Sequence, residues 1–150
     1  MKRKYIFAAA LLAWIAFIFC RSLKPAEISE TESRGGLELL ERLLPVGLSM
    51  HVIRKLAHFT EFAVLGVLAG LLFGRRRRNL LTGLLFSAMT GIATALCDET
   101  IQLFVPGRTG RVSDIWLDIA GAFTGAALIL IGGAVAGRVR GDIANAAEKE

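Results

Sequence analysis

The chain has 150 residues, of which 54% are hydrophobic, and its 18 Lys and Arg against 13 Asp and Glu give a net charge of +5. This length suits a single domain. The apolar residues come in long runs, and the charged residues gather in the gaps between those runs. A soluble fold would instead give each helix a polar face. The charge pattern therefore excludes a soluble enzyme and a soluble nucleic-acid binder.

Four apolar stretches are candidate membrane helices, at about residues 5–20, 56–74, 80–97 and 115–137. A bilayer-spanning helix needs roughly 20 mostly apolar residues, and the last two stretches meet this length. The second does so if it tolerates polar residues near its start. The first is short and follows a basic N-terminus, as a signal peptide would, but no small-residue cleavage site follows it. We expect one all-α membrane domain over residues 1–150, an integral membrane four-helix bundle.

Basic residues between the stretches predict the orientation. The positive-inside rule counts Lys and Arg in short loops near helix ends. Arg75–Arg78 lie in a very short loop, Lys2–Lys4 precede the first stretch, and Arg138, Arg140 and Lys149 follow the last one. The eight other basic residues are spread over longer loops at about 21–55 and 98–113. We therefore expect both termini in the cytoplasm. The arginine run is interpreted as a cytoplasmic anchor, so no nucleic-acid partner is expected.

The first outer loop has two parts. Residues 24–36 are polar, acidic and rich in helix breakers, which predicts a loop. Residues 37–44 repeat leucine at helical spacing, which predicts a short amphipathic helix. Such a helix would lie on the outer membrane surface, or alternatively cap the bundle.

Small residues four positions apart predict contacts between helices. In lipid such pairs let two backbones approach closely, because burial of apolar surface cannot drive association there. We expect the second and fourth membrane helices at the centre of the bundle. The pairs are Gly66 and Gly70, Gly121 and Gly125, and Gly133 and Gly137.

Ionisable residues cluster at 54–61, 98–102 and 106–118, all at the expected outer ends of helices. Ionisable groups at membrane depth are costly, and they predict a functional site that faces protein or water. We expect the three clusters to form one continuous polar pocket at the outer rim. Its ligand-binding residues are predicted to be Arg54, His58, Glu61, Asp98, Glu99, Gln102, Arg108, Arg111 and Asp114.

The spacing within the clusters predicts specific contacts. His58 should lie within hydrogen-bond or one-water reach of Glu61, Asp98 or Glu99, and an arginine of the 106–111 loop should contact an acid. Asp118 is the deepest acid, one turn inside the fourth membrane helix, and shares a stripe with the glycines of that helix. We expect it to pair with an arginine or a hydroxyl group.

The same clusters resemble the VanZ-like family. The residues that carry the resemblance are RKLAHFTEF from Arg54, DETIQLFVPGR from Asp98 and RVSD from Arg111. It covers roughly residues 50–130, and Thr100 departs from the aromatic residue common at that position. The resemblance implies a small multi-spanning protein of the bacterial inner (cytoplasmic) membrane. The namesake member is associated with low-level resistance to the glycopeptide teicoplanin, which implies a link to antibiotic tolerance.

Three functions fit these residues. Arginine forks and the backbone amides of the glycine-containing 106–111 loop suit phosphate or carboxylate groups. We expect the pocket to bind an anionic envelope component, namely a lipid headgroup, a lipid-linked glycan or a peptidoglycan-related group. One alternative is a membrane-embedded enzyme acting on a lipid-linked phosphate, by metal assistance or with His58 and Glu61 or Glu99 as acid–base groups. The second is a purely structural protein whose charges form internal pairs.

A histidine with several carboxylates is a ligand set that Zn²⁺ or Mn²⁺ accepts. However, four nearby cations would compete for the same carboxylates, and the chain has no two-histidine metal motif. We therefore expect no metal and no cofactor.

Overall fold

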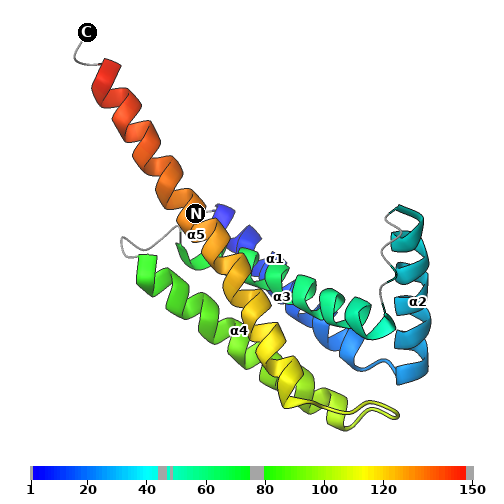
Figure 1. Cartoon of the computed structure of the whole chain (residues 1–150). Helices are drawn as coiled ribbons and strands as arrows, with labels where there is room; N and C mark the ends of the chain where they lie inside the picture. Colours follow the sequence, from blue (N-terminus) through cyan, green and yellow to red (C-terminus); the bar gives the residue numbers. More distant parts are fainter. Residues whose placement is uncertain (1, 44–46, 48, 75–79, 148–150) are drawn as a thin grey trace.

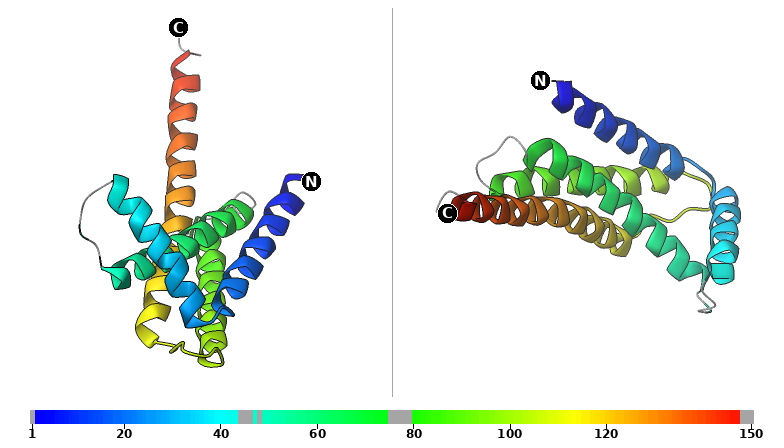
Figure 2. Two further views of the ribbon diagram at one scale, coloured as in Figure 1. Left: turned by 90° about the vertical axis from the view of Figure 1, so that its right-hand side faces the viewer. Right: turned by 90° about the horizontal axis from the view of Figure 1, so that it is seen from above.

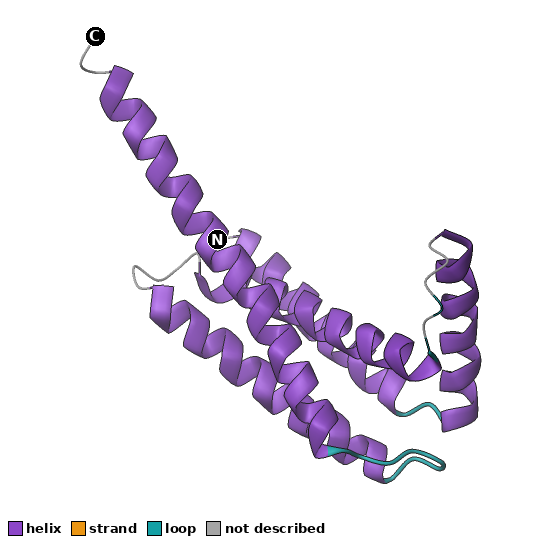
Figure 3. Cartoon of the chain, viewed as in Figure 1, coloured by secondary structure: helices purple, strands orange, loops and turns teal. Residues whose placement is uncertain are grey.

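A computed structural model describes residues 2–43, 47, 49–74 and 80–147. Throughout these ranges the regular elements are α-helices joined by short loops (Figure 1, Figure 3). Four of them are long and apolar enough to cross a membrane, so the expected all-α membrane bundle is confirmed. The arginine run at 75–78 lies outside the described residues. The helices are α1 (Lys2–Ser22), α2 (Ala26–Leu43), α3 (Met50–Gly74), α4 (Leu80–Leu103) and α5 (Val112–Ala147).

The membrane helices extend beyond the apolar stretches into the polar clusters. α3 begins at Met50, and the hydroxyl of Ser49 accepts a hydrogen bond from the amide of Val52 at 3.4 Å, as an N-cap residue does. α4 continues through the acidic cluster to Leu103. The polar residues of both clusters therefore lie on helices, at positions set by the helical repeat.

The expected loop at 24–36 is wrong, because α2 begins directly after Pro25. The carbonyl of Pro25 accepts a hydrogen bond from the amide of Ser29 at 3.2 Å, which starts the helix. Gly35 and Gly36 continue it, and a Cβ atom added at either position would meet no neighbouring atom within 4 Å. These glycines weaken a helix without ending it. The helix predicted at 37–44 is therefore the last part of α2, and residue 44 lies outside the described residues.

α3 and α5 pack along each other at the centre of the bundle, and α4 packs against both. α1 lies against α3 and α4, and α2 stands across the end where α1 finishes and α3 starts, in contact with α3 (Figure 1). α5 continues past the bundle (Figure 2). With 36 residues it is about 54 Å long, well beyond the roughly 30 Å hydrocarbon core of a bilayer.

Glycines bring the backbones of α3 and α5 into direct contact. A Cβ atom added at Gly66 would overlap the carbonyl oxygen of Ala122, and one at Gly125 would overlap that of Ala63. Gly70 and Gly121 also face the opposite helix. The expected central pairing of these two helices is thus confirmed. The same expectation is wrong for Gly133 and Gly137, which lie in the extension of α5 and have no neighbour within 4 Å.

We predict that Gly125→Leu destabilises the protein by about 1–3 kcal/mol, because the side chain forces α5 away from α3. Gly133→Leu is the matched control on the same helix, and it should melt at the parent temperature or slightly above, since leucine is the better helix former. Thermal unfolding in detergent, followed by circular dichroism, measures both. Equal melting temperatures for the two variants would contradict the α3–α5 contact.

Candidate functional site

The polar residues gather at one end of the bundle, where α1 and α4 finish and α3 and α5 begin (Figure 1). The loop of residues 104–111 crosses this end and joins α4 to α5. The three predicted clusters therefore meet at one end, one on α3, one on α4 and one on the loop and the start of α5.

The acids of α4 are buried and tied to neighbouring elements. Asp98 accepts hydrogen bonds from the hydroxyl of Ser22, at the end of α1, and from the amide of Gln102 at 2.8 Å. Glu99 accepts a hydrogen bond at 2.7 Å from the backbone amide of Arg111. Asp98 thus connects α4 to α1, and Glu99 holds the residue that precedes α5.

Glu61 of α3 faces α1. Its Oε1 lies 2.9 Å from Nε of Arg21 in a half-buried ion pair, and its backbone carbonyl accepts a hydrogen bond at 2.9 Å from the indole of Trp14. Arg21 also lies 3.9 Å from Glu32 of α2. A hydrogen bond from Lys24 lowers the pKa of Glu32. Arg21 was missed by the sequence analysis, because no spacing rule links it to an acid 40 positions later.

Arg108 binds backbone carbonyls at the end of α1. Its Nε donates to the carbonyl of Lys24 at 3.1 Å and its Nη2 to that of Arg21 at 3.3 Å. Burial, followed by the nearby charge of Arg54, lowers the pKa of Arg108. A cation suits this position because the last carbonyls of a helix carry partial negative charge. The 106–111 loop therefore contacts an acid through the backbone amide of Arg111, and its Arg108 side chain instead holds α1.

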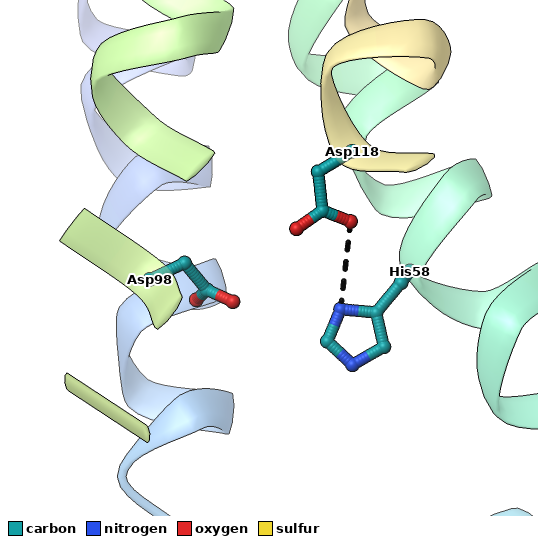
Figure 4. A group of neighbouring side chains, drawn as sticks. All are labelled: His58, Asp98 and Asp118. Atoms are coloured by element: carbon teal, nitrogen blue, oxygen red, sulfur yellow. Dashed lines mark ion pairs between the residues drawn. The ribbon is translucent and has the colours of Figure 1, made fainter. Parts of the chain in front are cut away.

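His58 and Asp118 face each other between α3 and α5 (Figure 4), with Nδ1 of His58 3.7 Å from Oδ1 of Asp118. Ligand atoms of His58, Asp118 and Asp98 all lie within 4.8 Å of one another, so one water could bridge His58 to Asp98, as predicted. Asp118 is fully buried, and neither of its carboxylate oxygens has a hydrogen-bond partner among the described residues. The expected pairing of Asp118 with an arginine or hydroxyl is therefore wrong, because its neighbour is an imidazole.

A pocket of about 100 Å³ opens between the start of α3, the loop and the start of α5. This volume equals that of roughly three liquid water molecules, enough for a phosphate or carboxylate group. Basic side chains outnumber acidic ones among its lining residues. Asp114 is the acid among them, and it lies 3.6 Å from Lys55. The lining residues are His51, Arg54, Lys55, His58, Thr109, Arg111, Asp114 and Leu117.

Four of the nine predicted ligand-binding residues line this pocket, namely Arg54, His58, Arg111 and Asp114. The other five (Glu61, Asp98, Glu99, Gln102 and Arg108) contact other parts of the protein as described above. His51 was missed because it precedes the apolar stretch and was assigned to a loop. The sequence feature that could have identified His51 is its spacing of four and seven residues from Lys55 and His58, which places all three on one helical face.

Comparison with known proteins identifies the family of the chain. The sequence model of the VanZ/LLP1 family matches residues 7–133, a range that includes every residue of the pocket and of the buried acids. No match was found among curated proteins or among solved structures. Since the matched range covers most of the chain, this membrane protein belongs to the VanZ/LLP1 family.

Proposed function

We propose that the protein binds an anionic component of the bacterial cell envelope in the pocket at the α4–α5 loop. One observation supports this above all: Arg54, Lys55 and Arg111 line the pocket and Asp114 is the acid among its lining residues. This excess of positive charge at the edge of a low-dielectric layer favours an anion.

The two arginines of the pocket are available to a ligand. Lys55 is paired with Asp114, but both side chains are partly exposed, so the pair contributes little. Neither Arg54 nor Arg111 forms an ion pair with any residue in the described ranges. A guanidinium donates two parallel hydrogen bonds to a phosphate or carboxylate, which suits a headgroup or a peptide carboxylate.

The loop that carries Arg111 is held close to α4. Gly107 has a positive φ of 75°, which favours glycine. A Cβ atom at Gly110 would lie 2.9 Å from the backbone carbonyl oxygen of Glu99. This close approach, with the hydrogen bond from Arg111 to Glu99, supports a preformed position for Arg111 beside the pocket.

The ligand is proposed to be a lipid headgroup, a lipid-linked glycan or a peptidoglycan-related carboxylate, with the pocket on the outer side of the inner membrane and both termini in the cytoplasm. We also propose a link to glycopeptide tolerance, on the resemblance to the namesake VanZ-like member. The alternative of acid–base catalysis on a lipid-linked phosphate is favoured by His58, which both lines the pocket and faces Asp118. Glu61 is less suited to that role because it is paired with Arg21. Glu99 does not line the pocket, and one of its carboxylate oxygens accepts the hydrogen bond from the amide of Arg111.

We predict that Arg54→Gln and Arg111→Gln each weaken binding of an anionic probe at least tenfold, since each removes a charge-assisted hydrogen bond. The probes are farnesyl phosphate, dihexanoyl phosphatidylglycerol and D-alanyl-D-alanine, titrated into protein in an uncharged detergent and followed by calorimetry. Arg138→Gln, in the exposed extension of α5, is the control and should bind like the parent. Comparison of the three probes identifies the source of the anion. Equal affinities of the parent and all variants would exclude this pocket as the anion-binding site.

The proposed orientation predicts the activity of alkaline-phosphatase fusions. A fusion after Phe104 should be active because the reporter is exported, and one after Arg77 should be inactive because the arginine loop stays in the cytoplasm. The reverse pattern would put the pocket on the cytoplasmic side and exclude peptidoglycan-related ligands.

The proposed link to tolerance is tested by growth. Expression of the parent chain in a teicoplanin-sensitive bacterium should raise the inhibitory concentration of teicoplanin, and an equally expressed Arg111→Gln variant should not. An equal rise of the inhibitory concentration with both chains would show that tolerance does not depend on the pocket.

A further inference from the structure

His58, Asp98 and Asp118 come from three different helices and point toward one another in the interior of the bundle (Figure 4). Both acids are completely buried. The ligand atoms of the three side chains lie within 4.8 Å of one another. Ligand atoms of one tetrahedral Zn²⁺ ion lie about 3.5 Å apart, because each sits at roughly 2.0–2.2 Å from the ion. His58 and Asp118 already lie near that separation, at 3.7 Å, and a side-chain movement of about 1 Å brings the third ligand to the same ion.

Polar atoms in this cluster lack protein partners. Both carboxylate oxygens of Asp118 and Nδ1 of His58 are buried without a hydrogen-bond partner among the described residues. The 3.7 Å between Nδ1 of His58 and Oδ1 of Asp118 exceeds hydrogen-bond distance. Buried polar groups are almost always satisfied, so an unsatisfied carboxylate aimed at two other ligand-type side chains points to a bound group.

Among the described residues, no lysine or arginine forms an ion pair with Asp98 or Asp118. Arg21 pairs with Glu61, Lys55 pairs with Asp114, and Arg108 binds backbone carbonyls at the end of α1. Arg54 and Arg111 line the anion pocket instead. The cations that were expected to compete with a metal for the carboxylates therefore form no ion pair with Asp98 or Asp118 in the part of the chain that the structure describes. Two buried carboxylates remain, and a divalent cation balances the charge of both.

Asp98 is also oriented as a metal ligand would be. Ser22 and Gln102 each donate a hydrogen bond to its carboxylate, and each oxygen keeps a second lone pair for an ion. Such outer hydrogen bonds fix ligating carboxylates in metal sites. We propose that His58, Asp98 and Asp118 bind one divalent transition-metal ion, Zn²⁺ or Mn²⁺, through one nitrogen and two carboxylate ligands. His58 also lines the pocket, so the ion would lie beside the anion site, with its remaining positions filled by water or by the ligand.

The test uses the full chain, purified in detergent with a tag that contains no histidine, treated with a chelator and then desalted. Zn²⁺ or Mn²⁺ is added, excess ion is removed, and the retained metal is measured by mass spectrometry and by competition with a chromophoric chelator. We expect one ion per parent chain. Asp118→Asn keeps the shape of the side chain and should weaken binding at least tenfold. Asp142→Asn, at an exposed position in the extension of the same helix, is the matched control, and it should bind like the parent.

A second measurement distinguishes loss of metal binding from loss of folding. The ion should raise the melting temperature of the parent and of Asp142→Asn, because it binds only the folded state, and should not raise that of Asp118→Asn. If Asp118→Asn does not fold, Asp98→Asn serves in its place with the same expected loss. The proposal is overturned if the parent retains no ion, or if the Asp118→Asn and Asp98→Asn variants retain as much as the parent.

This proposal stands apart from anion binding. Asp98 and Asp118 do not line the pocket, and Arg54 and Arg111 do not belong to the metal cluster. Loss of metal in Asp118→Asn with intact metal binding in Arg111→Gln would therefore support the ion site whatever the outcome of the anion titrations.

Discussion

The contact between the backbones of α3 and α5 determines where the functional side chains lie. Glycines at 66, 121 and 125 remove the side chains that would separate the two helices. Close packing of this kind holds helices together in lipid, where apolar burial gives no driving force. Asp118 lies one turn before Gly121 on the same stripe, so the packing that joins the helices also places Asp118 against His58. The chemistry of the site therefore depends on the glycine contact.

The ionisable residues at this end of the bundle fall into two groups with different physical roles. Arg21 and Arg108 bind groups of the protein itself and hold α1 against the rest of the bundle. Arg54 and Arg111 line the pocket without an acid of their own among the described residues. Charge that is paired internally stabilises the arrangement, and charge that is left unpaired at a pocket is available to a ligand. This division supports a binding role over a purely structural one.

Much of this arrangement could be predicted because it follows from repeats and from the position of charges along the chain. The glycine pairs at 66/70 and 121/125 share a helical face, and the three polar clusters each border an apolar stretch at the same expected depth. The pair of Arg21 with Glu61 depends on how α1 packs on α3, which no local pattern encodes. The part of α2 between residues 26 and 36 was predicted as a loop because this stretch is polar and contains Gly35 and Gly36, which a local pattern reads as helix breakers. Asp118 was correctly predicted to lie inside the fourth membrane helix, α5. Its neighbour could not be predicted, because it depends on the rotation of α5 against α3.

The most direct test of the account is a structure of the protein in nanodiscs made from bacterial lipids, at a resolution that shows side chains. We predict non-protein density in the pocket, within hydrogen-bond distance of the guanidinium groups of Arg54 and Arg111. Both arginines paired with acids of the protein, around a closed pocket, would contradict the central claim that this end of the bundle binds an envelope anion.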